Sequence, residues 1–164
     1  MWHRSILSVL TVLFALGAAT MPTPKLQCEE LLNTVLPVAQ KFLSAHSEFY
    51  PFGASMKVDG SIVMVAAYDG RDKPPSQPLI DLLRAGFIRD AKEGVILASA
   101  TAYDVRVIPP GRTDKTDAVE IELDHRDSYS TVVFYPYSLH DGSVKFGEPF
   151  ANAGEFRIFG KHGS

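Results

Sequence analysis

Five charged residues on two neighbouring segments form the densest polar feature of the sequence. They alternate with apolar residues, as outward-facing side chains of strands do, and they are Asp104, Arg106, Glu120, Glu122 and Asp124. If the loop between the segments pairs them about position 113, Arg106 lies beside Glu120 and Asp104 beside Glu122. A pair of carboxylates raises a pKa or holds a cation, and it performs acid–base chemistry where a pocket excludes water. A solvated sheet face is the simpler interpretation, so we assign no catalytic residue.

The histidines, serines and glycines of the sequence form no recognisable metal, nucleophile or phosphate site. Asp124-His125 and His140-Asp141 bracket a predicted strand, which would hold them roughly 20 Å apart at about 3.4 Å per residue. Zinc-site spacings, the G-x-S-x-G serine turn and glycine-rich phosphate loops are all missing. We therefore expect no metal and no cofactor. A small metal-assisted hydrolase that uses Asp104, Glu122 and His125 stays open as the alternative.

Aromatic residues beside prolines form a more suggestive pattern. They cluster at predicted strand ends, and the four that we single out are Tyr50, Phe52, Tyr135 and Tyr137. Aromatic side chains at such positions often line a ligand groove or a protein contact. Ordinary closure of the core is the alternative role. The sequence thus offers these four residues as a binding surface for an unknown protein or small ligand.

The first half of the chain predicts a helix followed by a β-hairpin. Apolar residues recur every three or four positions over 25–49, and Pro37 predicts a kink or a division into two helices. Asp59-Gly60 predicts a two-residue turn between two strands. Residues 62–67 are apolar at every position, which is typical of a strand buried on both faces. We therefore expect this second strand at the centre of the sheet.

The second half predicts another helix and a series of strands. The helix covers 77–93, where the apolar residues share one side and Gly86 suggests a close approach to the sheet. Strands follow at 95–107, 117–124, 130–135 and, more briefly, 144–146. Sequential strands joined by turns form antiparallel sheets. The sequence predicts an α+β fold, a single antiparallel sheet of about five strands with two covering helices in the order α-β-β-α-β-β-β, which looks like the profilin and roadblock architecture.

The chain begins with a segment typical of an export signal. A basic head ending at Arg4 precedes an apolar core of about 14 residues, which is short for a bilayer span of roughly 20. We interpret residues 1–19 as a signal peptide and 20–164 as a single domain, periplasmic or secreted, without membrane attachment after cleavage. An uncleaved anchor and a cytoplasmic start at Met21 are the alternatives. The cytoplasmic start would favour a roadblock-like regulatory dimer.

Composition narrows the classes of partner. A formal net charge of −3 without basic clusters provides no surface for nucleic acid or for an anionic membrane. Cys28 is the only cysteine, so the chain cannot form an internal disulfide. We interpret Cys28 as a small, half-buried residue, and a disulfide between two chains is the alternative.

Several short stretches resemble an uncharacterised bacterial protein family with no assigned activity. They read Phe52-Gly53-Ala54, Ala66-Ala67-Tyr68-Asp69-Gly70, Asp117-Ala118-Val119, Pro136-Tyr137 and Gly147-Glu148-Pro149-Phe150-Ala151. Because that family carries no assigned activity, the resemblance implies no functional residue. We expect an exported, non-enzymatic binding or interaction domain, with a homodimer among its candidate assemblies.

Overall fold

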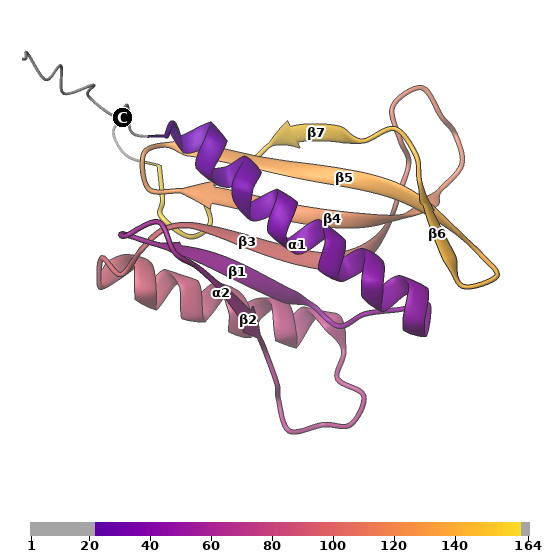
Figure 1. Ribbon diagram of the computed structural model, residues 1–164, viewed down its shortest axis with the longest axis horizontal. Helices are drawn as coiled ribbons and strands as arrows, with labels where there is room; N and C mark the ends of the chain where they lie inside the picture. Colours follow the sequence, from indigo (N-terminus) through magenta and orange to yellow (C-terminus); the bar gives the residue numbers. More distant parts are fainter. Residues whose placement is uncertain (1–21, 162–164) are drawn as a thin grey trace, which may run out of the picture.

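The computed structural model describes residues 22–161, so the signal peptide expected at 1–19 lies outside the described residues. Within this range the chain forms one antiparallel sheet of seven strands and two helices (Figure 1). The helices are α1 (Pro24–His46) and α2 (Ser76–Lys92). The strands are β1 (Phe52–Lys57), β2 (Ile62–Ala66), β3 (Ile96–Val107), β4 (Thr116–His125), β5 (Tyr129–His140), β6 (Ser143–Phe146) and β7 (Phe150–Ala153). The α+β class with one antiparallel sheet is confirmed.

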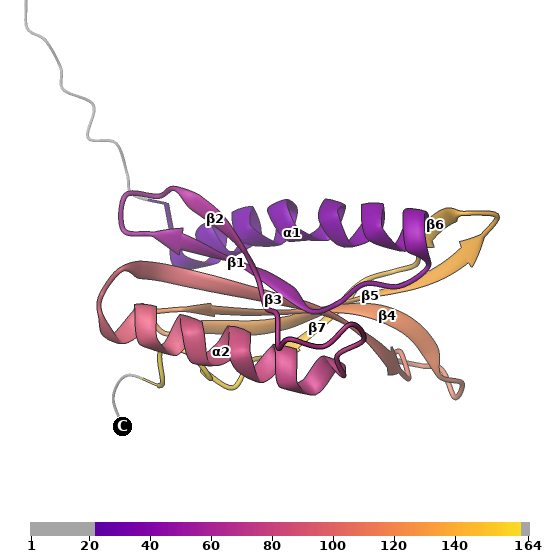
Figure 2. The ribbon, with the colours of Figure 1, turned by 90° about the horizontal axis from the view of Figure 1, so that it is seen from below.

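The sheet has more strands than the five expected from the sequence. Its order is β2-β1-β3-β4-β5, and β5 then pairs with β6 along one half and with β7 along the other. Each of these two four-residue strands forms its own ladder with the long strand β5. The two helices cover opposite faces of the sheet, as Figure 2 shows. We call these the α1 face and the α2 face.

The main core lies between α1 and the sheet. The N–H of Leu26 donates to the Thr23 hydroxyl at 3.3 Å, so Thr23 caps α1 as its sequence position predicts. The helix runs through Pro37 as one element, and the expected division into two helices is wrong. Alanines on β3 leave room for larger helix side chains, and the core includes Leu31, Val35, Leu43, Ala98, Ala100 and Ala102.

Cys28 belongs to this core and is completely buried. Burial, with Asp124 and Glu29 nearby, raises the pKa of its thiol to about 12. The folded domain therefore presents no reactive thiol, and a disulfide between two folded chains is excluded.

A smaller core lies between α2 and the sheet, where it includes Leu83, Phe87, Ile96, Val65, Ala67, Ile158 and Phe159. Gly53 of β1 lies directly beneath the Phe87 ring. A Cβ atom at Gly53 would stand 2.5 Å from the Ala100 carbonyl oxygen and 2.9 Å from Phe87 Cζ. The absence of a side chain at Gly53 therefore allows α2 to approach the sheet. Gly86 of α2 faces open space, so its expected close contact is wrong.

Strand β2 lies at an edge of the sheet rather than at its centre. It pairs with β1 on one side and ends the sheet on the other. Its side chains are partly open to solvent, with Val63 39% and Met64 42% exposed. The central position expected from the apolar pattern is wrong, because β3 occupies the inner side of β1.

The turn between β1 and β2 also differs from the expected two-residue type. The Gly60 N–H donates to the Lys57 carbonyl at 2.9 Å, and the Lys57 N–H donates to the Ser61 carbonyl at 2.8 Å. These bonds enclose a three-residue loop, in which Gly60 adopts a φ of 84°. Lys57 and Ser61 are consequently a hydrogen-bonded pair, which fixes the direction of every backbone group along β2.

Candidate functional site

The β3–β4 register separates the charged residues that the sequence placed in one row. Three pairs define it, namely Asp104–Val119, Arg106–Asp117 and Tyr103–Glu120. Cross-strand partners share a face, so Asp104 and Arg106 lie on the α1 face, whereas Glu120 and Glu122 lie on the α2 face. The expected pairs Arg106–Glu120 and Asp104–Glu122 are wrong. The connecting loop shifts the register by three positions, and an odd shift moves side chains to the other face.

This register also separates the residues of the alternative hydrolase. Asp104 and Glu122 lie on opposite faces of the sheet. His125 shares the α1 face with Asp104, but it lies six residues along β4 from Val119, the cross-strand partner of Asp104, which is roughly 20 Å at 3.4 Å per residue. Over residues 22–161 no three histidine, cysteine or carboxylate side chains converge as a metal site requires. The geometry gives that hydrolase no assembled site.

His125 is a structural residue of the α1 face. It is buried, and the backbone N–H of Asp127 donates to its Nδ1 at 3.0 Å. The proton therefore resides on Nε2, which donates to Gln27 Oε1 at 2.8 Å. Both nitrogens are satisfied in the neutral ring, and burial lowers the pKa of the imidazole.

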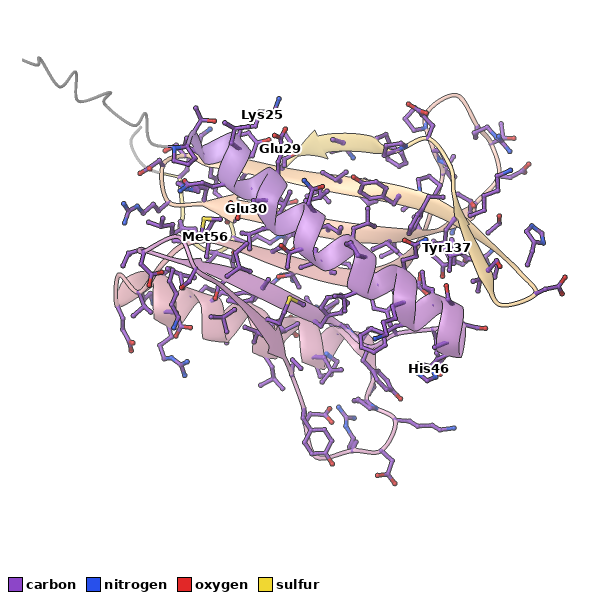
Figure 3. The ribbon with its side chains drawn as sticks, in the orientation of Figure 1. Lys25, Glu29, Glu30, His46, Met56 and Tyr137 are labelled. Carbon is purple, nitrogen blue, oxygen red and sulfur yellow. The ribbon has the colours of Figure 1, made fainter. Side chains whose placement is uncertain are left out.

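An open cleft of about 850 Å³ lies where α1 ends and β1 begins. Its walls come from the last turns of α1, the linker to β1, the end of β2 and the β2–α2 loop. Its lining includes Phe42, His46, Glu48, Phe49, Tyr50, Phe52, Lys73 and Asp104. Its volume lies in the range of roughly 300–1,000 Å³ that is usual for small-molecule sites. In Figure 3, His46 marks the C-terminal end of α1, and Tyr137 lies on the sheet at the same end of the molecule.

Three phenylalanine rings build the α1 side of the cleft. The ring centroids of Phe42 and Phe52 are 6.1 Å apart and those of Phe49 and Phe52 are 5.8 Å apart, both in edge-to-face geometry. Ser47 ends α1 with a left-handed φ of 62°, which turns the chain back and lets Phe49 reach Phe52. Phe49 and Phe52 are themselves buried. This wall is therefore anchored in the core.

Tyr50 forms the rim of the cleft. Its side chain is half exposed, and its hydroxyl lies 3.5 Å from the Asp72 carbonyl oxygen, the outer limit of a hydrogen bond. This contact joins the linker after α1 to the β2–α2 loop, which also contributes Lys73. Two segments far apart in sequence thus meet at the rim.

Asp104 supplies a carboxylate to the cleft. Its Oδ1 accepts a hydrogen bond from the Tyr137 hydroxyl at 2.9 Å. Among residues 22–161 no lysine or arginine forms an ion pair with it. The side chain is open to the cleft, yet neighbouring groups displace enough water to raise the pKa of the carboxyl, and the Tyr137 bond opposes that rise only in part. Burial beside Asp104 also raises the pKa of Tyr137.

The structure brings together three of the four aromatic residues singled out from the sequence. Tyr50 and Phe52 line the cleft, and Tyr137 bonds to the carboxylate that faces it. Tyr135 lies apart, because its ring packs edge-on against Phe146 with centroids 5.8 Å apart.

Sequence reasoning missed the other cleft residues. Phe42 follows the ordinary helical repeat of α1, and Lys73 lies in a polar loop. Neither carries a local signal that distinguishes it from a core or surface residue. Only the tertiary fold places both beside Tyr50.

A second polar group lies on the α2 face and consists of Arg84, Tyr103, Glu120 and Glu122. Arg84 donates to both oxygens of Glu122, at 2.7 and 3.2 Å. The Tyr103 hydroxyl lies 2.7 Å from Glu120 and 3.0 Å from Glu122. Burial raises the pKa of both Tyr103 and Glu120. The face expected to be wet is therefore covered by α2.

This second group has no room for a ligand. The neighbouring cavity, which Glu122 and Arg157 border, measures about 20 Å³, the space of one water molecule. The Arg84–Glu122 pair instead fixes α2 to the sheet. We therefore treat the cleft as the candidate site.

The chain matches no family model, no curated protein and no solved structure. Its resemblance to a bacterial family without assigned activity stays a prediction. Over residues 22–161, no helix combines the length and the apolar character that crossing a membrane requires.

Proposed function

We propose that this chain is an exported, non-enzymatic binding domain that holds a small organic ligand in the cleft. The observation that carries the proposal is an opening of about 850 Å³ that combines an aromatic wall with two carboxylates, Asp104 and Glu48, neither of which forms an ion pair among residues 22–161. Small-molecule sites combine these features, an apolar lining and a few polar groups that fix orientation.

The lining favours a ligand with an aromatic or aliphatic body and an ammonium group. Aromatic faces attract cations, and a partly desolvated carboxylate gains most from a positively charged hydrogen-bond donor. Asp104 lies among the aromatic residues of the sheet end, whereas Lys73 lies on the loop opposite. The ammonium group would therefore contact Asp104, and the apolar body would contact Phe42 and Phe52.

A matched series of probes tests this function. Phenethylamine, 2-phenylethanol and phenylacetate share a ring and differ in charge, and their binding is measured by NMR titration of the labelled protein. We expect the amine to bind best and Asp104→Asn to weaken it about 10- to 100-fold, the equivalent of a charged hydrogen bond. The same variant should leave the alcohol unchanged.

Tyr50→Ala tests the rim, and Tyr68→Ala is the control because Tyr68 is exposed outside the cleft. We expect only Tyr50→Ala to weaken all three probes. Equal binding of the three probes, or binding that survives both Tyr50→Ala and Asp104→Asn, would remove the cleft as the site.

Export is the second part of the proposal. It rests on the apolar segment over residues 1–19, which is typical of a signal peptide. Mass spectrometry of the native protein from separated cell fractions should find a chain that begins at Thr20 or Met21 outside the cytoplasm. A cytoplasmic chain that begins at Met21 would instead support the regulatory-dimer alternative.

A further inference from the structure

Strand β2 exposes an apolar edge that most monomeric proteins avoid. Its residues, Ile62–Ala66, include no charge and no proline. Ten large hydrophobic side chains are exposed among the described residues, and six of them lie on or beside this strand, namely Val58, Val63, Met64, Tyr68, Leu82 and Val95. Val58 and Val95 are neighbours through a backbone hydrogen bond, and Tyr68 and Leu82 border one hollow with the end of β2. Concentrated apolar exposure of this kind marks an interaction surface.

The backbone of this edge presents N–H and C=O groups, unpaired within the described part of the chain, to which another strand could bind. Lys57 and Ser61 form a hydrogen-bonded pair, and such pairs alternate along an antiparallel ladder. Val63 and Val65 therefore direct their backbone groups toward β1. The N–H and C=O groups of Ile62, Met64 and Ala66 point away from the sheet, where no described strand meets them.

We infer that a second copy of this chain pairs with β2 antiparallel to it, about a two-fold axis at Met64. Met64 then faces Met64 of the partner subunit, and Ile62 faces Ala66 of the partner subunit. All three outward residues become hydrogen-bonded, and the two sheets join into one. Val63 meets Val65 of the partner subunit on the α2 face.

A second copy fits this edge for two reasons. A strand of five uncharged residues pairs with itself without like-charge contacts, and pairing about a two-fold axis closes after one partner. Both helices pack chiefly on β1 and β3, and β2 joins their cores through Ile62 and Val65, so its outer edge and the side chains of Val63 and Met64 stay open to a partner. In the joined sheet β2 would have a hydrogen-bonded strand on each edge, and side chains of the partner strand would cover part of the exposed Val63 and Met64. This inference does not depend on the ligand of the cleft.

Sedimentation velocity of the mature protein over a range of concentrations tests the assembly. We expect a reversible dimer for the wild type and a monomer for Met64→Lys, because a lysine on the edge opposes pairing. Ile108→Lys is the matched control, since Ile108 is also exposed but lies away from β2, and it should stay dimeric. A wild type that is monomeric at its highest soluble concentration would overturn the proposal, as would a folded Met64→Lys variant that still dimerises.

A cysteine substitution provides a second test, which does not require the Met64→Lys variant to fold. Met64→Cys should form a covalent dimer under mild oxidation, since the axis brings the two Met64 positions face to face. Ile108→Cys should not, and the native Cys28 is buried in either case. Equal cross-linking of Met64→Cys and Ile108→Cys would contradict the axis.

Discussion

The two edges of the sheet are built in opposite ways. At the far edge, the long strand β5 is flanked by β6 and β7, two strands of four residues, with Lys145 in β6 and Pro149 between them. Short strands, an edge lysine and a proline are devices that block pairing with foreign strands. Strand β2, at five residues, is also short, but its sequence is uninterruptedly apolar and contains neither a lysine nor a proline. The comparison indicates that the fold closes one edge and leaves the other available.

The buried residues of β1, next to the β2 edge, also differ in type from those of β4. Near β2, the buried residues of β1 are glycine, serine and apolar residues. On β4 the chain buries titratable groups, and the pKa values of Glu120 and Asp124 are raised while that of His125 is lowered. Packing therefore governs the β2 side, and protonation bears on the β4 side.

If packing governs the β2 side, the largest loss of stability should follow from a substitution that pushes α2 away from β1. Gly53→Ala should lower the free energy of unfolding by about 3 kcal/mol, the upper part of the usual range for overpacking, because the new Cβ meets a backbone carbonyl as well as Phe87. Urea denaturation followed by circular dichroism measures the loss. Ser55→Ala, on the same strand and face, should cost under about 1 kcal/mol. Equal losses for the two variants would show that the close approach is unimportant.

Removing the arginine that joins α2 to β4 should have the next largest effect. Arg84→Ala deprives a half-buried carboxylate of two charged hydrogen bonds, so we expect a loss of about 2 kcal/mol. Arg106→Ala breaks an ion pair that is exposed at both ends and should cost under about 0.5 kcal/mol. Denaturant titration of both variants gives the contrast. An Arg106→Ala loss as large as that of Arg84→Ala would contradict the burial difference.

A change of pH should act on the β4 side through His125. Its folded pKa lies below the ordinary 6.5, so as the pH falls below about 6.5 the unfolded chain takes up a proton that the folded chain refuses. Stability should fall with decreasing pH by at most about 1.4 kcal/mol per unit from this group.

Subtracting the stability–pH curve of His125→Gln from that of the wild type isolates this slope. His140→Gln is the control, since His140 is exposed at the end of β5. A His125→Gln curve that parallels the wild type below pH 6.5 would refute the role of His125.

The smallest expected effect is a gain in stability. Gly86 sits in the middle of α2 with open space around the position of a Cβ atom. Gly86→Ala should therefore raise the free energy of unfolding by about 0.5–1 kcal/mol, because alanine has the better helix propensity. A loss in the thermal melt instead would mean that Gly86 approaches another part of the molecule.

Local patterns were sufficient to predict both helices and every strand except β7, but not which strands are neighbours. The alternation of Val119, Ile121 and Leu123 correctly indicates the side of β4 that faces the core, because a period of two is a property of the strand itself. The order of strands is a tertiary property. An apolar run such as Ile62–Ala66 has the same sequence whether it lies inside one sheet or awaits a partner at the edge.

The aromatic part of the candidate site was largely predictable, since Tyr50, Phe52 and Tyr137 all lie at strand ends beside prolines. Tyr50 and Phe52 lie two positions apart and could be identified together. Asp104 was assigned to the wrong row, because the loop after β3 determines a register that its composition does not reveal. Phe42 reaches the cleft through the reversal of the chain at Ser47.

Cys28 has one more consequence for this molecule. Its thiol is inaccessible and seldom ionised, since burial raises its pKa to about 12. A thiol reagent can modify it only after α1 separates from the sheet. The rate of modification under native conditions therefore reports how often α1 separates from the sheet, and the single cysteine measures the local stability of that helix.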